Sequence, residues 1–245
     1  DIRAYLRHYN RTLKAPFAYD PTNDDPSYDR VRVRQAIRAL ELDHVALAET
    51  AARMRRARGA LQARVVAVAR EVVVEATCQE RPTGDLLIDR DGFAGEERDT
   101  QLRLMAAAVQ WVAGAEYRPR ARALEGLLDG ALAGSGGTLQ GARVWVEKRH
   151  LRIGRELKAM PVAGDLFDGR WRVSGDGTWR ALGEDGWRQL ADKPADVPPA
   201  EAGYTLPALF SGGDLIACPT LAPSPDASAE FHPPFGPFVA FLESR

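Results

Sequence analysis

The residues best suited to chemistry in this 245-residue sequence lie in one stretch, DPTNDDPSYDRVRVR, which runs from Asp20 to Arg34. Its first half combines aspartates, an asparagine and two prolines, which favour Asx-type turns and exclude a helix. Its second half and the residues after it place arginines four positions apart, at Arg30, Arg34 and Arg38. On a helix these guanidinium groups share one face. Because arginine offers planar, bidentate donors, the pattern predicts a site for phosphate or carboxylate groups.

A helix that begins just after the turn would position these arginines. Ser27 is the expected N-cap, with Tyr28 and Asp29 in the first turn. The helix N-terminus would add its positive end and its free N–H groups to the site. Apolar residues that recur at helical spacing predict a buried stripe away from the arginines, formed by Val33, Ile37 and Leu40.

Two interpretations of this junction are open. In the first, the acidic loop holds the arginines in place for a ligand that carries phosphate, with a cationic co-substrate near the carboxylates. In the second, Arg30 and Arg34 pair with loop carboxylates at Asp20, Asp25 or Asp29 and only fix the loop to the helix. A second basic cluster either contacts nucleic acid or is a solvated helix face, and it comprises Arg53, Arg55, Arg56 and Arg58.

The distribution of charge along the sequence is uneven. Between Arg30 and Arg70 the sequence has ten arginines and three carboxylates, a net charge of +7. The whole chain has a net charge of −1, so the remaining residues carry −8. Such asymmetry is typical of a protein with a face that binds a polyanion, and it predicts contacts to a nucleic-acid backbone.

Other composition signals exclude several classes of protein. Cys78 and Cys218 belong to no CxxC pattern, so two free thiols are expected in preference to a disulfide. The four histidines lie apart and show no metal-ligand spacing, so no bound metal is expected. No apolar run approaches the roughly 18 to 20 residues of a membrane span, and the charged start lacks the apolar centre of a signal peptide. We therefore expect a cytoplasmic protein without a membrane part.

The order of patterns predicts an α+β protein, with an N-terminal helical domain followed by a β-rich C-terminal domain. The run EVVVEA at residues 71–76 is compatible with a strand. Its continuity with the preceding Ala/Arg-rich stretch favours a helix over residues 43–77 instead. After GSGG at residues 134–137, alternating segments between Gly and Asp turns predict strand pairs, and the terminal FVAFL predicts an edge strand. Helices are expected at residues 2–8, from 29 onward, and at 43–77, 96–112 and 119–133, the last with Pro119 at its first position.

The residues of the first stretch also match a known pattern. The pattern D-x-x-N-x-D-x-x-Y-D-R-x-x-x-R is formed by Asp20, Asn23, Asp25, Tyr28, Asp29, Arg30 and Arg34. It resembles the segment that follows the catalytic domain in bacterial tRNA(Ile)-lysidine synthetases. The preceding IRAYL resembles the closing helix of that family's nucleotide-binding domain, and GGTLQGARV and LRIGRE resemble elements of its C-terminal part. The resemblance touches most of the chain.

The resemblance implies a ligase that uses ATP and Mg²⁺ to adenylylate the wobble cytidine of the isoleucine tRNA with a CAU anticodon. Lysine then displaces AMP. The family's Ser-Gly-Gly-x-Asp-Ser signature is absent here, and SGGDL at residues 211–215 is expected to be a hairpin turn. We therefore expect that the ATP domain lies outside this sequence, and that the chain alone binds neither ATP nor Mg²⁺ and is inactive.

The resemblance also implies roles for single residues. Arg30 and Arg34 are expected to approach tRNA or adenylate phosphate on the catalytic side. The substrate loop would comprise Asp20, Asn23, Asp25 and Asp29. From charge alone, and not from the resemblance, contacts to the tRNA backbone are expected from Arg38, Arg53, Arg55, Arg56 and Arg58.

The expected organisation has three parts: a remnant of the nucleotide-binding domain at 1–23, a helical tRNA-side domain at 24–134 and a β-rich domain at 135–245. The implied partners are the CAU-anticodon tRNA(Ile) and lysine, and the family precedent together with an edge strand is compatible with a homodimer. Two alternatives stay open. One is a non-catalytic, arginine-rich RNA-binding or protein-interaction module, and the other is a structural protein whose arginines are only solvated.

Overall fold

The computed structural model describes residues 2–14, 20–160 and 166–245, and of residues 2–4 only the backbone. The chain forms two compact units, Asp1–Ala57 and Arg58–Arg245, here called the N-terminal unit and the C-terminal unit. The expected connector includes residues 15–19, which lie outside the described residues.

The N-terminal unit is helical, as predicted. Helix α2 is confirmed, but its N-cap is Tyr28 without a side-chain hydrogen bond, so the expected Ser27 cap is wrong. Its C-terminal end is closed by two backbone bonds, from Glu41 N–H to Arg38 O and from Leu42 N–H to Ile37 O. The elements of the unit are α1 (Ile2–Thr12), the 3₁₀ turn η1 (Pro21–Asn23), α2 (Asp29–Ala39) and the first part of α3 (His44–Val72).

The apolar side chains of the N-terminal unit are largely exposed. Val33 is 57% and Leu40 68% exposed, so the predicted buried stripe of α2 is wrong. Val31, which is 3% exposed, is the only buried residue among those described in this unit. A periodic stripe is buried only when a second layer packs against it, and the described residues of this unit supply none.

The C-terminal unit is built on a five-stranded antiparallel sheet with the strand order β1-β2-β5-β4-β3. The run EVVVEA enters β1, so its prediction as helix is wrong. Val73, Ala76 and Cys78 are buried there, because β1 pairs with β2 and buries one side of the ribbon. The strands are β1 (Val73–Cys78), β2 (Arg81–Asp89), β3 (Gly137–Leu139), β4 (Ala142–Val146) and β5 (His150–Arg155).

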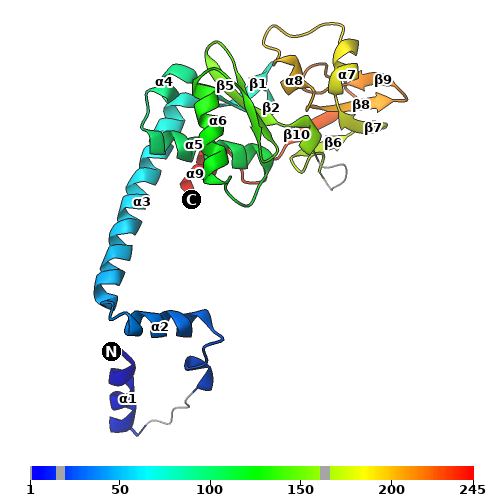
Figure 1. Cartoon of the computed structure of the whole chain (residues 1–245). Coiled ribbons are helices and arrows are strands. Elements are labelled where there is room, and N and C mark those ends of the chain that lie inside the picture. Colours follow the sequence, from blue (N-terminus) through cyan, green and yellow to red (C-terminus); the bar gives the residue numbers. More distant parts are fainter. Residues whose placement is uncertain (1, 15–19, 161–165) are drawn as a thin grey trace. The chain divides into compact units, whose positions relative to one another are not determined.

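Two helices pack against this sheet, as Figure 1 shows: α5 (Arg98–Ala113) contacts β2, β4 and β5, and α6 (Ala121–Leu132) contacts β3 and β4. The short helix α4 (Arg90–Ala94) follows β2 directly. The core between the layers includes Trp111 and Leu128, both at most 1% exposed. Helix α6 begins after Arg120, so Pro119 precedes the helix instead of occupying its first position.

A second, smaller core surrounds Trp171 and Phe210. Two strand pairs in this region join segments that are distant in sequence, because β6 pairs with β10 and β7 pairs with β8. The 3₁₀ turn η2 (Leu157–Ala159) leads from the first sheet toward this region. Its elements are β6 (Trp171–Ser174), β7 (Thr178–Ala181), α7 (Gly183–Gln189), α8 (Ala200–Gly203), β8 (Pro207–Ser211), β9 (Asp214–Ala217) and β10 (Ser228–Phe231).

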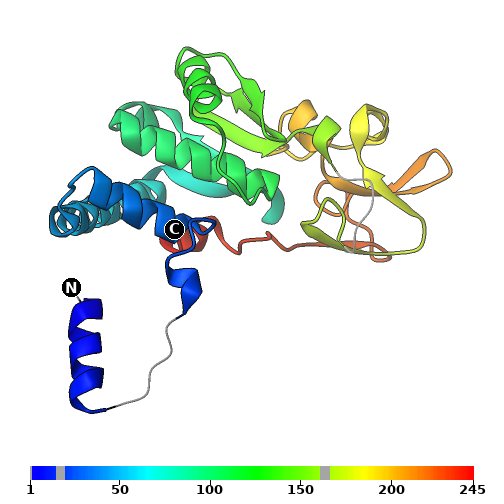
Figure 2. The same cartoon turned by 60° about the horizontal axis from the view of Figure 1, so that its bottom comes forward.

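After β10 the chain returns to the first core, where α9 (Phe238–Glu243) contacts α5 (Figure 2). The terminal FVAFL is therefore helix, and its prediction as an edge strand is wrong. Phe238, Phe241 and Leu242 are all buried, and their i, i+3, i+4 spacing is that of a helix face. Because FVAFL does not form the expected edge strand, it gives no support to a homodimer.

The α+β class is confirmed: a helical N-terminal region is followed by sheets. The compact units nevertheless differ from the expected parts. A boundary at 134/135 would divide the five-stranded sheet, because β1 and β2 precede it and β3 to β5 follow it. Cys78 and Cys218 are free thiols, as predicted, and both are buried. In the described part of the chain, no helix combines the length and the apolar character needed to cross a bilayer.

Candidate nucleic-acid interface

The loop before α2 is ordered by its own aspartates. Asp20 caps η1: its Oδ1 accepts hydrogen bonds from the backbone N of Thr22 at 2.9 Å and from Thr22 Oγ1 at 2.8 Å. These bonds, with a smaller contribution from the charge of Arg30, lower the pKa of the Asp20 carboxyl. Asn23 lies at the end of η1, and its backbone N–H donates to Asp20 O. The sequence predicted this Asx-type turn.

The other loop carboxylates also have local partners. Asp25 Oδ1 accepts from the backbone N of Ser27 at 2.8 Å, and this bond lowers the pKa of Asp25. Asp29, in the first turn of α2, forms an ion pair with Arg32. Neither Asp25 nor Asp29 holds one of the three arginines in the predicted row.

Arg30, Arg34 and Arg38 lie on one face of α2, as their spacing predicted. The Arg30 guanidinium donates to Thr22 Oγ1 at 3.3 Å and lies 5.5 Å from the centre of the Tyr28 ring. Thr22 therefore links Asp20 to Arg30 through its hydroxyl group. Among the described residues, neither Arg30 nor Arg34 forms an ion pair with the loop carboxylates, so Arg30 contacts the loop through the Thr22 hydroxyl instead of the expected ion pairs.

Arg34 and Arg38 also show no ion pair or hydrogen bond to the residues that the structure describes. Arg34 is partly buried and Arg38 is exposed. The first-turn N–H groups of α2 lack a side-chain cap, and the helix dipole adds positive potential there. This face therefore presents hydrogen-bond donors and positive charge, which suit the binding of a phosphate group.

The second basic cluster does not act as one group. Arg53 contacts Glu49 at 3.6 Å and Thr50 Oγ1 at 3.0 Å. Arg55 and Arg56 are exposed and show no ion pair to described residues. Arg58 belongs to the C-terminal unit, where it donates to a backbone carbonyl oxygen.

The predicted LRIGRE element contains a structural arginine. Arg155 lies at the end of β5 and is 7% exposed, and its Nη2 lies 2.8 Å from Asp168 Oδ1. Asp168 also binds Arg170, which is 3% exposed and donates to Gly84 O. This network joins β5 to the segment before β6, so Arg155 is used inside the fold.

The described residues show no side-chain cluster for a metal ion, and SGGDL does not form a phosphate-binding loop. No group of three or more His, Cys, Asp or Glu side chains in the described ranges is arranged to hold a metal ion. SGGDL forms the hairpin turn between β8 and β9, as predicted, with Ser211 paired to Asp214. A hairpin turn offers no helix N-terminus for a phosphate group.

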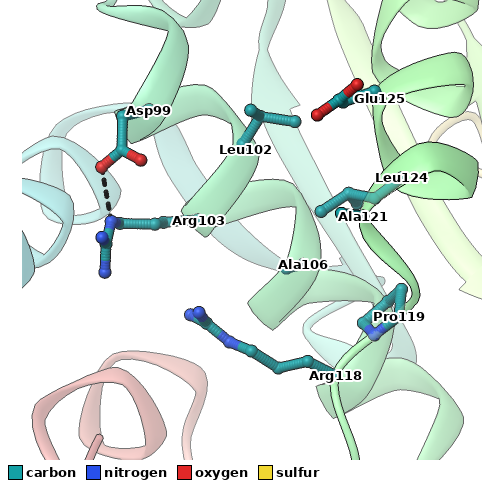
Figure 3. Close-up of a pocket in the computed structure, with 9 residues that line it drawn as sticks. All are labelled: Asp99, Leu102, Arg103, Ala106, Arg118, Pro119, Ala121, Leu124 and Glu125. Carbon is teal, nitrogen blue, oxygen red and sulfur yellow. Dashed lines mark hydrogen bonds and ion pairs between the residues drawn. The ribbon is translucent and has the colours of Figure 1, made fainter. Parts of the chain in front are cut away.

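One basic site was missed by the sequence reasoning. Arg118 lines a pocket of about 290 Å³ between α5 and α6, together with Arg103 and the acidic residues Asp99 and Glu125 (Figure 3). The signal in the sequence was RPRAR at residues 118–122, which lies outside the arginine-rich segment that dominates the charge count.

Comparison with known proteins supports the resemblance. The chain is 33% identical, over 254 aligned positions, to a tRNA(Ile)-lysidine synthase of Ruegeria pomeroyi. The alignment covers 99% of this chain and 59% of the relative, so the chain spans less than two thirds of that protein's length. No family model matches the chain. The recognition made from the first motif is thereby confirmed at the level of a sequence relationship.

Proposed function

Because this chain is related to a tRNA(Ile)-lysidine synthase, we propose that it acts in the formation of lysidine on tRNA(Ile) in the cytoplasm. In the reaction that the resemblance implies, ATP activates the wobble cytidine of the CAU anticodon and the amine of lysine displaces AMP. The observation that carries the proposal is a relationship that extends over 99% of the chain.

Within that reaction, the chain supplies contacts to the tRNA. Arg30 and Arg34 bind a phosphate of tRNA or of the adenylate, and the substrate loop of Asp20, Asn23, Asp25 and Asp29 sets the entry to α2. The support is local: Arg30 is positioned by Thr22 and Tyr28, and Arg34 has no ion pair with a described residue. Further backbone contacts come from Arg38, Arg53, Arg55, Arg56 and Arg58.

The ATP, Mg²⁺ and lysine chemistry belongs, in this proposal, to a part that these 245 residues do not contain. The sequence lacks the Ser-Gly-Gly-x-Asp-Ser signature, and the described residues show no side-chain cluster for a metal ion. The chain by itself therefore binds tRNA without ligating lysine.

Salt-dependent tRNA binding tests the role of α2. We expect the chain to bind a transcript of CAU-anticodon tRNA(Ile), with a log affinity that falls by about 0.7 to 0.9 per log unit of salt for each phosphate contact. The double variant Arg30→Ala/Arg34→Ala should reduce both affinity and slope. Arg172→Ala/Arg188→Ala is a charge-matched control, because both arginines are exposed and each already lies beside a glutamate, Glu230 and Glu184 respectively. Equal losses in both proteins, or salt-insensitive binding, would contradict the proposed role.

Lysine incorporation tests the reaction itself. The chain alone, incubated with ATP, Mg²⁺, radiolabelled lysine and the tRNA transcript, should incorporate none. In a second protein, the chain is fused to the part of the Ruegeria pomeroyi relative that lies outside the alignment. This fusion should incorporate lysine, and Arg30→Ala/Arg34→Ala should reduce its activity. Activity of the isolated chain would overturn the assigned division of labour.

A second candidate function is a protein-interaction module. The observation that favours it is the exposure of large apolar side chains in the N-terminal unit, among them Tyr5, Leu13 and Leu40. This alternative predicts no lysine incorporation in the joined protein and no preference for tRNA over other polyanions.

A further inference from the structure

Arg118 differs from most arginines of the C-terminal unit in having no carboxylate partner among the described residues. Counted over those residues alone, eleven arginines of the unit form ion pairs with Asp or Glu side chains. Arg118 lies in the short segment between α5 and α6. Within the described residues, its side chain forms neither an ion pair nor a hydrogen bond. Its donors are therefore available to a ligand.

Three other arginines lie close enough to Arg118 to affect the pKa of its guanidinium group. Partial burial lowers the pKa of Arg118, and the positive charges of Arg103, Arg245 and Arg58 lower it further, against an opposing effect of Asp99. Figure 3 shows the Arg103 and Arg118 guanidinium groups extending toward the same side of the pocket. Four like charges thus lie near one another: Arg58 on α3, Arg103 on α5, Arg118 before α6 and Arg245 after α9.

Three contacts hold Arg58 and Arg245 in place. Arg58 Nη2 donates to Arg245 O at 3.2 Å. The Arg245 guanidinium lies 4.5 Å from the centre of the Phe241 ring and 5.8 Å from that of Phe235. Of the four, Arg103 alone has an Asp or Glu partner in the described ranges, and its Nε donates to Asp99 Oδ2 at 2.5 Å. The cluster is therefore preorganised and keeps an excess of positive charge.

The neighbouring pocket shapes the approach to the cluster. Its floor is apolar, with Leu102, Ala106 and Leu124. Glu125 lies at the end away from the Arg118 guanidinium (Figure 3). An anion would consequently approach at the Arg118 end, where Asp99 is already paired with Arg103.

We propose that Arg58, Arg103, Arg118 and Arg245 form a second RNA-contact surface, which binds a backbone phosphate of a folded RNA. A phosphate accepts bidentate hydrogen bonds from Arg118 and relieves the repulsion among the four guanidinium groups. The surface lies in the C-terminal unit and is separate in sequence from the row of arginines on α2. The choice of RNA as the source of the phosphate rests on the proposed function, whereas binding at this surface does not require the formation of lysidine.

A charge-matched pair of variants tests this surface. Arg118→Gln removes the unpaired cation, and Arg188→Gln removes an exposed cation that already pairs with Glu184. The affinity of each protein is measured by fluorescence anisotropy, over a series of KCl concentrations, for a tRNA(Ile) transcript and for a 20-base-pair RNA duplex. We expect Arg118→Gln to weaken binding of both RNAs about tenfold and to reduce the salt slope by about 0.7 to 0.9. Arg188→Gln should change neither.

The outcomes separate this surface from the proposed function. Equal binding by wild type and Arg118→Gln overturns the surface, as does an equal loss in Arg118→Gln and Arg188→Gln, since that would be a general effect of net charge. Absence of RNA binding by the wild-type chain overturns both proposals. If wild type binds the duplex as well as the tRNA, and Arg118→Gln weakens both, the surface stands while preference for tRNA(Ile) fails.

Discussion

Arginines in the two units have opposite environments. In the C-terminal unit, Arg155 and Arg170 are nearly inaccessible and share the carboxylate of Asp168. In the N-terminal unit, Arg34 and Arg38 have no ion pair with a described residue, and the chain around them has almost no buried side chains. The same residue type thus stabilises one unit from inside and presents donors on the surface of the other.

The difference follows from the cost of burying charge. A buried guanidinium is tolerated only when carboxylates and carbonyl groups satisfy it, and such networks are strongly destabilised when one partner is removed. Asp85 illustrates the cost: burial raises its pKa to about 6, although Arg152 Nη1 lies 3.0 Å from its Oδ2. Exposed arginines bear no such cost, so they can remain unpaired until a ligand arrives.

The largest effect is expected from Asp168→Asn. Asparagine tolerates the positive φ of 51° at this position and keeps the shape of the side chain, so the loss is mainly that of charge. Because Arg155 and Arg170 would stay buried without their shared carboxylate, unfolding free energy should fall by about 3 to 5 kcal/mol. Urea titration followed by tryptophan fluorescence measures this.

The control for this variant is Asp29→Asn in the N-terminal unit. Asp29 pairs with Arg32 at the surface, where its side chain is 85% exposed, so no measurable change in the urea midpoint is expected. Similar midpoints for Asp168→Asn and Asp29→Asn would show that burial does not distinguish the two kinds of ion pair.

A second comparison concerns apolar side chains. Leu128 on α6 is fully buried, and Leu128→Ala should reduce stability by about 2 to 5 kcal/mol through lost burial and the cavity it leaves. Leu40 is 68% exposed, so Leu40→Ala should change the free energy of unfolding by less than about 0.5 kcal/mol. Both are read from urea unfolding. A large loss for Leu40→Ala would mean that the N-terminal unit buries this residue against another surface.

A third comparison uses two glycines. A Cβ on Gly154 of β5 would overlap Asp85 and lie 2.9 Å from Trp145 Cζ3, so Gly154→Ala should cost about 1 to 3 kcal/mol. A Cβ on Gly59 of α3 meets no atom within 4 Å, so Gly59→Ala should stabilise the helix by about 0.5 to 1 kcal/mol. Thermal unfolding should therefore shift in opposite directions for the two variants, and shifts of the same sign would contradict this account.

The sequence predicted local features better than tertiary ones. The turn at Asp20, helix α2 and the SGGDL hairpin depend on residues close in sequence, and all three are present. The strand at Val73–Cys78 was predicted as helix, because its pairing with β2 and its burial come from residues that the local pattern does not include. Similarly, the sequence predicted a strand at α9. All five residues of FVAFL are apolar, so the run alone does not show that Phe238, Phe241 and Leu242 form the buried face.

The candidate site shows the same limit. The spacing of Arg30, Arg34 and Arg38 was enough to place them on one face of a helix. It could not show that Asp25 and Asp29 have other partners, or that Thr22 connects Asp20 to Arg30. Arg118 was missed because its cluster assembles from four segments distant in sequence, which no charge count along the chain can bring together.

The smallest expected effect concerns the Thr22 hydroxyl, and it tests whether the exposed loop is ordered before any ligand binds. The hydrogen bond from this hydroxyl is the main cause of the lowered pKa of Asp20. Thr22→Val should therefore raise that pKa toward its ordinary value, and Thr22→Ser should retain the low value, as followed by ¹³C NMR titration of the carboxyl carbon. Global stability should not change, because Asp20 and Arg30 are both exposed. If Thr22→Val leaves the Asp20 pKa unaltered, the loop does not hold Thr22 between Asp20 and Arg30. The arginine row of α2 would then lack the prior positioning that distinguishes it from a solvated helix face.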